Sequence, residues 1–151
     1  METFFEIWKT NRSHFVETLD SLSNEQLNKV PEGFNNNIIW NVGHSLVIQQ
    51  VLIYKRSGFD MKISDSLFEL YKSGTKPERT ISEAEVNELR SLLESTMDTT
   101  KVDIKAKIFQ SYEELTTSTR FHIGDFQTAL QFNNYHEGLH LGYIFCLKKF
   151  V

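Results

Sequence analysis

The sequence predicts an all-α protein, a four-helix bundle with one long crossover connection. Four segments carry apolar residues at the three- and four-residue spacing of a helix, and turn signals separate them. Only two prolines and seven glycines interrupt the 151 residues, so long helices are permitted. The chain contains no repeat and no low-complexity segment, so we expect residues 1–151 to form one domain.

The first helix is predicted over residues 3–22. Its apolar face is interrupted by Asn11 and consists of Phe4, Trp8, Phe15, Leu19 and Leu22. Ser23 and Gln26 then form a capping box at the start of a short turn. Pro31 and Gly33 break the chain before the next helix.

The second helix is predicted over residues 38–57, with Gly58 at the position after its end. It is apolar almost all round, and its narrow polar side consists chiefly of Asn41, Ser45, Gln49 and Arg56. Such a helix must be covered on several sides, and we expect part of that cover to come from a second copy of the chain.

Residues 59–81 are predicted to form an irregular crossover that contains a short amphipathic segment at residues 66–72. The third helix begins at Ser82, where Glu85 completes a second capping box, and continues through Met97. Residues 100–124 give the weakest signal. Within them, residues 107–109 suggest a short strand and residues 116–119 a loop.

The fourth helix is predicted from an N-cap at Asp125 to about Lys149. Cys146, the single cysteine, lies in its apolar run 143–147, where we expect it to act as a small buried hydrophobe.

Composition excludes several classes of function. A net charge of -4 and the absence of a basic cluster argue against nucleic acid as a partner. No stretch approaches the ~18 consecutive apolar residues of a membrane span, and the first residues lack the basic segment of a signal peptide. We therefore expect no membrane partner and a cytoplasmic location.

The sharpest motif is the pair His136 and His140. Residues four apart lie on one helix face with Cβ atoms ~5–6 Å apart, so both rings can reach one metal ion. The stripe through Asn133 and both histidines steps at helical spacing with apolar neighbours, which predicts that the pair points inward. A metal ion would satisfy two buried rings together.

His44 is the third predicted ligand. It lies on the stripe Trp40, His44, Val47 and Val51 of the second helix and faces the core. A blander interpretation, three core histidines without a metal, stays open. The two remaining histidines, His14 and His122, fit the pattern less well and are interpreted as structural.

The spacing of His136, Glu137 and His140 also matches the HExxH motif of zinc metalloproteases, with Glu137 as general base. We disfavour that interpretation because no His, Asp or Glu follows His140 to complete such a site. Glu137 is also rotated away from both histidines at ~3.6 residues per turn.

The chain resembles the DinB-like (DinB/YfiT) superfamily of metal-binding four-helix bundles over nearly its whole length. The most specific parts of the resemblance are residues 36–44 and 134–142. The resemblance implies a metal triad at His44, His136 and His140. Many relatives have Gln where this chain has Tyr143. The resemblance further implies dimers and a zinc, nickel, iron or manganese ion. It also implies thiol-dependent S-transferase or isomerase activity with low-molecular-weight thiols, or metal-dependent hydrolase activity.

We therefore expect a metal-dependent transferase or hydrolase that acts on a small electrophilic substrate, with a thiol as co-substrate and a homodimer as the assembly. Glu137, Asn133 and Tyr143 are candidates for orienting the metal ligands or the substrate. The alternative is a metal-stapled bundle that binds a small molecule or associates without turnover.

Overall fold

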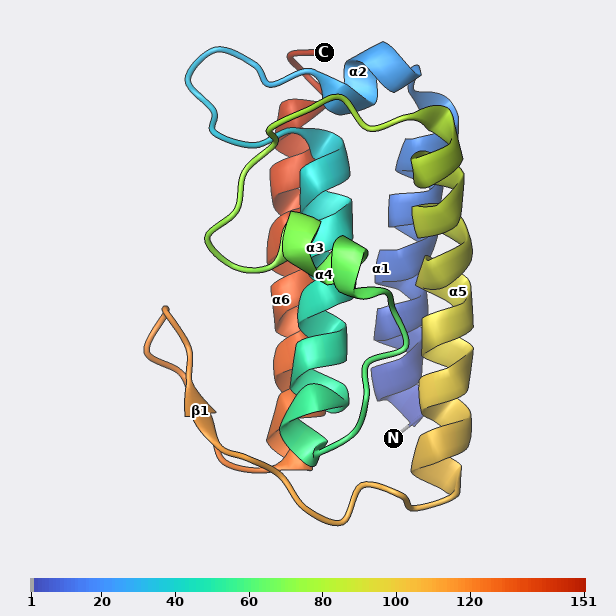
Figure 1. Ribbon diagram of the computed structural model, residues 1–151, viewed down its shortest axis with the longest axis vertical. Helices are drawn as coiled ribbons and strands as arrows, with labels where there is room; N and C mark the ends of the chain where they lie inside the picture. Colours follow the sequence, from blue (N-terminus) through green and yellow to red (C-terminus); the bar gives the residue numbers. More distant parts are fainter. Residues whose placement is uncertain (1) are drawn as a thin grey trace.

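The computed structural model describes residues 2–151, and its four long helices form a bundle (Figure 1). They are α1 (Glu2–Ser21), α3 (Ile38–Ile53), α5 (Glu83–Lys105) and α6 (Phe126–Leu147). Helices α5 and α6 each pack against both α1 and α3, which closes a ring of four. The predicted all-α bundle is confirmed.

The crossover between α3 and α5 sets the direction of the helices. After α3 the chain passes through a 3-10 helix, η1 (Lys55–Ser57), and the short helix α4 (Asp65–Tyr71), and then returns to the end of the bundle where α3 began (Figure 1). Helices α3 and α5 therefore run in the same direction, while α1 and α6 run opposite to them. The predicted long crossover is confirmed, and its predicted amphipathic segment, residues 66–72, is largely the helix α4.

The predicted caps are present. Ser23 and Gln26 form the capping box of α2 (Asn24–Asn28), and Ser82 and Glu85 form that of α5. The Asp125 side chain accepts a hydrogen bond from the backbone at the start of α6. Gly58 adopts a left-handed conformation, φ 80°, which ends η1 and favours glycine.

Helix α3 lies at the centre of the bundle. All its residues except Ile48 and Val51 are buried. This includes most of the narrow polar side, because Asn41, Ser45 and Gln49 are each at most 1% exposed. The cover that we expected from a second copy is therefore already supplied within one chain by α2, α4, α5 and α6.

The segment between α5 and α6 differs from the prediction. Helix α5 extends to Lys105, and residues 107–109 form no strand. Instead Phe109 stacks on Phe126, with ring centroids 4.4 Å apart, so an aromatic contact holds this part of the chain. The two short strands are β1 (Leu115–Thr116) and β2 (His122–Ile123), paired antiparallel.

Helix α6 ends at Leu147, two residues before the predicted end. The prediction that Cys146 is buried is wrong: its side chain is exposed. Ile144 and Leu147 turn into the core instead, and this places Cys146 and Phe145 on the outer face. Over residues 2–151, no helix has both the length and the apolar character needed to cross a membrane.

Candidate metal centre

His44 of α3 meets His136 and His140 of α6 where these two helices pack together. Each ring offers one nitrogen, and the three nitrogens all lie within 4.8 Å of one another. The ring centroids are 4.6–5.3 Å apart. The three residues predicted as ligands are therefore brought together, from segments about ninety residues apart in the sequence.

His44 is held on two sides. Its Nδ1 lies 2.7 Å from the carbonyl oxygen of Tyr71, the last residue of α4. Because a carbonyl only accepts, Nδ1 must carry the proton, which leaves Nε2 unprotonated. The Trp40 ring stacks on the imidazole, with centroids 4.6 Å apart and planes 12° from parallel. The ring is therefore fixed in both tautomer and orientation.

Gly43 makes the Tyr71 contact possible. A Cβ atom at Gly43 would lie 2.6 Å from carbon atoms of the Tyr71 ring, closer than van der Waals contact allows. The missing side chain lets α4 approach α3 closely, and that approach delivers the Tyr71 carbonyl to His44.

His140 is held by Asn41. Its Nδ1 lies 2.8 Å from Asn41 Oδ1. The amide orientation follows from the other end of the same side chain, where Asn41 Nδ2 donates to the Asn37 carbonyl at 2.7 Å. Oδ1 must then accept from His140 Nδ1, and Nε2 of His140 is again left free.

His136 lacks such a partner. Its Nδ1 is buried and forms no hydrogen bond with the described residues. A buried ring nitrogen without a partner is unfavourable, and coordination of a metal through Nδ1 would offset that cost. The orphaned nitrogen is thus an independent sign that the cluster fits a bound ion.

The electrostatics keep all three rings neutral. Burial, followed by the charges of His140 and His44, lowers the pKa of His136 to about 3. Burial and the His44 charge lower the pKa of His140 to about 4. Burial also lowers the pKa of His44, against the hydrogen bond to the Tyr71 carbonyl. Neutral imidazoles are the form that binds a metal ion.

Glu137 lies outside the cluster. The face of α6 that points into the core differs from the predicted one. Asn133, Glu137 and Leu141 occupy the core side, while the two histidines are only partly buried beside α3. The Glu137 carboxylate is 0% exposed and accepts hydrogen bonds from Trp8, Arg12 and Asn133.

Arg12 forms a buried ion pair with Glu137, with Nη2 and Oε1 2.7 Å apart. Burial raises the pKa of the Glu137 carboxyl group, and the Arg12 guanidinium opposes that rise. A carboxylate engaged in this way is not free to act as the general base of an HExxH peptidase, which agrees with the preference stated from the sequence. Tyr143, the third orienting candidate, is 44% exposed and packs edge-on against Phe34.

Sequence reasoning did not identify Tyr71 or Arg12 as parts of this region. Tyr71 contributes a backbone carbonyl, for which no side-chain pattern exists. Arg12 gave one signal: it follows Asn11, the polar residue that interrupts the apolar face of α1, and both are buried. The side chains of His14 and His122 are 41% and 60% exposed and lie outside the cluster, beside Glu17 and Glu114.

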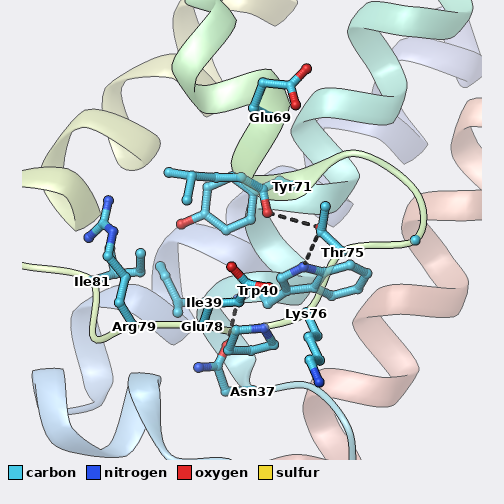
Figure 2. A pocket seen from close by; sticks show the side chains of 13 residues that line it. Asn37, Ile39, Trp40, Glu69, Tyr71, Thr75, Lys76, Glu78, Arg79 and Ile81 are labelled. Carbon is cyan, nitrogen blue, oxygen red and sulfur yellow. Dashed lines mark hydrogen bonds between the residues drawn. The ribbon is translucent and has the colours of Figure 1, made fainter.

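A cavity of about 500 Å³, whose lining residues Figure 2 shows, lies next to the centre. Trp40 and Tyr71 both line it, so the residues that hold His44 also form its wall. The Trp40 indole donates to Thr75 Oγ1 at 3.0 Å across this wall.

The comparison with family models gives one result. The model described as the DinB superfamily matches residues 7–144, which include all three histidines and most of the bundle. No curated protein matches the chain.

Proposed function

The chain belongs to the DinB superfamily, and from that premise we propose that His44, His136 and His140 hold one divalent metal ion in an enzyme. The observation that carries the proposal is the convergence of three imidazoles whose nitrogens lie within 4.8 Å of one another. In two of them Nδ1 is already bonded to an oxygen acceptor, so Nε2 is presented to the cluster. Imidazole ligands suit zinc, nickel and iron, whereas manganese, the fourth metal that the family implies, prefers oxygen ligands.

Three neutral ligands would leave a coordination position open. A bound ion supplies a Lewis acid that lowers the pKa of a water or thiol at that position. The protein contributes the orientation of the imidazoles through Tyr71, Trp40 and Asn41. The partial exposure of His136 and His140 supports access for a small molecule.

The reaction that we propose is transfer of a low-molecular-weight thiol to a small electrophilic substrate, with hydrolysis as the second candidate. The alternative function is a metal-stapled bundle without turnover. The almost complete burial of α3 is compatible with that alternative, because a metal that joins α3 to α6 would stabilise such a bundle.

We also propose a homodimer formed through the outer face of α6. This face carries Tyr135, Leu139 and Phe145, each about half exposed, and no charged side chain. Gly138 and Gly142 lie on it, and a Cβ atom at either position would meet nothing within 4 Å. Glycine in a helix costs about 1 kcal/mol relative to alanine, and one chain alone gives no packing reason for that cost.

The metal proposal is tested on protein purified without a histidine tag. Metal analysis of the wild type is expected to give about one ion per chain, and His44→Ala should lower this content at least tenfold. His14→Ala is the matched control, because it removes an exposed histidine outside the cluster. Unchanged metal content in His44→Ala would show that His44 is not a ligand.

Turnover is tested with the metal-loaded protein and a panel of thiols against model electrophiles. Thiol consumption that depends on both the metal and His44 supports the enzyme. Stoichiometric metal binding without turnover across the panel would favour the stapled bundle.

The dimer is tested by light scattering of the eluted protein. Gly138→Ala with Gly142→Ala is expected to weaken self-association, whereas Ser95→Ala on the exposed face of α5 should not. If the wild type and the double variant were both monomeric, that result would contradict the proposal.

A further inference from the structure

A second cavity lies one helical turn from His44, on the opposite side from Trp40. Its volume is about 420 Å³, and Ile48 and Lys72 are among its lining residues. Ile48 follows His44 by four residues, about 6 Å along the helix axis. Lys72 follows Tyr71, whose carbonyl accepts from His44 Nδ1. Two separate elements thus connect this cavity to the proposed ligand.

The floor of this cavity is the only part of α3 that is not buried. Ile48 and Val51 are partly exposed, and every other residue of Ile38–Ile53 is buried. Phe68 of α4 adds a half-buried aromatic ring. An accessible apolar floor on an otherwise covered helix is typical of a small-molecule site, and the volume lies within the usual range for such sites.

The walls of the cavity are positively charged. Lys55, Arg56 and Lys72 line it together with one carboxylate, Glu113, which gives a formal charge of +2 in a chain whose net charge is -4. Arg56 pairs with Glu113 at 2.8 Å, and Lys72 pairs with Glu69 outside this cavity.

Lys55 has no carboxylate partner among the described residues, and its Nζ lies 4.8 Å from the centre of the Phe68 ring. Lys72 Nζ lies 5.7 Å from the same ring. Both ammonium groups therefore lie close to the same aromatic ring, and the exposed Lys55 charge is free to meet a ligand.

The cavity beside Trp40 does not share this character. Two cations, Lys76 and Arg79, line it together with two carboxylates, Glu69 and Glu78. It is balanced in charge and gives no preference for an anion. Lys76 therefore provides a matched control for the lysines of the second cavity.

We propose that the second cavity binds the anionic end of the substrate, a carboxylate or a similar oxyanion, and that the apolar body of the substrate lies on Ile48 and Val51. This inference rests on the proposed function, because it places the other end of the molecule at the three-histidine centre. Lys55 follows His44 by eleven residues, about 16 Å along the axis. A molecule about 16 Å long would therefore be needed to reach from the Lys55 backbone to the centre.

A structural role for these cations makes a different prediction. Lys55 and Arg56 lie in η1, directly after the C-terminal end of α3, where cations compensate the helix dipole. Such a role would affect stability but would not discriminate between charged and neutral ligands.

The test compares two probes of equal size, 1-naphthoate and neutral 1-naphthamide, by calorimetric or NMR titration of metal-free protein at low salt. Without a metal, the carboxylate has no ion to coordinate. The anion is expected to bind at least fivefold more tightly than the amide. Lys55→Gln and Lys72→Gln should each weaken naphthoate binding about threefold, and Lys76→Gln should not change it.

Glu113→Gln provides a gain-of-affinity test. Removal of the one carboxylate in the cavity should strengthen naphthoate binding about threefold, since Arg56 is released from its ion pair. Naphthamide binding should change less than twofold in all four variants. Equal affinity for the two probes, or a loss in Lys76→Gln as large as that in Lys55→Gln, would overturn the proposal.

His44→Ala separates this inference from the metal proposal. We expect this variant to lose its metal content and to bind naphthoate within twofold of the metal-free wild type. If the metal is lost and the preference for the anion stays, anion binding in the cavity does not depend on the metal centre. If the wild type binds metal but shows no anion preference, only the cavity proposal fails.

Discussion

The three clustered histidines should make the metal-free fold sensitive to mild acid. The pKa values of His136 and His140 are lowered to about 3 and about 4, whereas an unfolded histidine titrates near ~6.5. Between pH 6.5 and 4 the unfolded chain therefore binds more protons than the folded chain. The free energy of unfolding must then fall as the pH falls through this window.

The size of the effect follows from the width of the window. Each ring contributes about 1.4 kcal/mol for every pH unit, or about 2 kcal/mol between pH 6.5 and pH 5. Both rings are partly exposed, and solvent screening reduces this figure. We expect His136 and His140 together to account for a loss of about 2–4 kcal/mol between pH 7 and pH 5.

Chemical denaturation of chelator-treated protein at pH 7 and pH 5 measures this loss. His136→Gln should reduce it by about 1–2 kcal/mol, because one titrating ring is gone, while His14→Gln should leave it unchanged. A loss of the same size in His136→Gln and wild type would refute the reasoning, since the difference between the two proteins cancels the contribution of all other groups.

Three further predictions concern the residues that support the centre. Asn41→Ala removes the acceptor that fixes one imidazole and should weaken metal binding 10–100-fold in a competition titration with a chelator. Gly43→Ala should lower the free energy of unfolding by about 1–3 kcal/mol and also weaken metal binding, because the new Cβ displaces Tyr71. If both stability and metal affinity were preserved, the Tyr71 ring would be shown to move aside without cost. Arg12→Leu should cost about 3–5 kcal/mol of unfolding free energy by leaving the Glu137 carboxylate buried without its partner, and a paired Glu137→Leu change should recover much of it.

The helices were predictable because local chemistry marks their ends. Ser23, Ser82 and Asp125 cap helices by hydrogen bonds within three residues, and Gly58 ends η1 through its own backbone conformation. The segment after α5 was not predictable, because Phe109 is placed by its contact with Phe126 rather than by any local pattern.

The cluster of histidines was predictable from periodicity, but the exact rotation of α6 was not. Spacing places His136 and His140 on one face without deciding whether they or Glu137 lie deepest. The buried Arg12 determines that Glu137 lies deepest, since a fully buried carboxylate requires a buried cation. The rotation also explains why Cys146 lies outside, although its neighbours in sequence are apolar.

Helix α6 supplies the missing partner for two earlier helices: Glu137 for Arg12 of α1, and the paired imidazoles for His44 of α3. A ribosome delivers α1 and α3 long before it delivers α6. During that interval the nascent chain exposes the strongly apolar α3 and an uncompensated arginine, a combination that favours aggregation. Uptake of a metal ion would therefore report that translation of the last helix is complete.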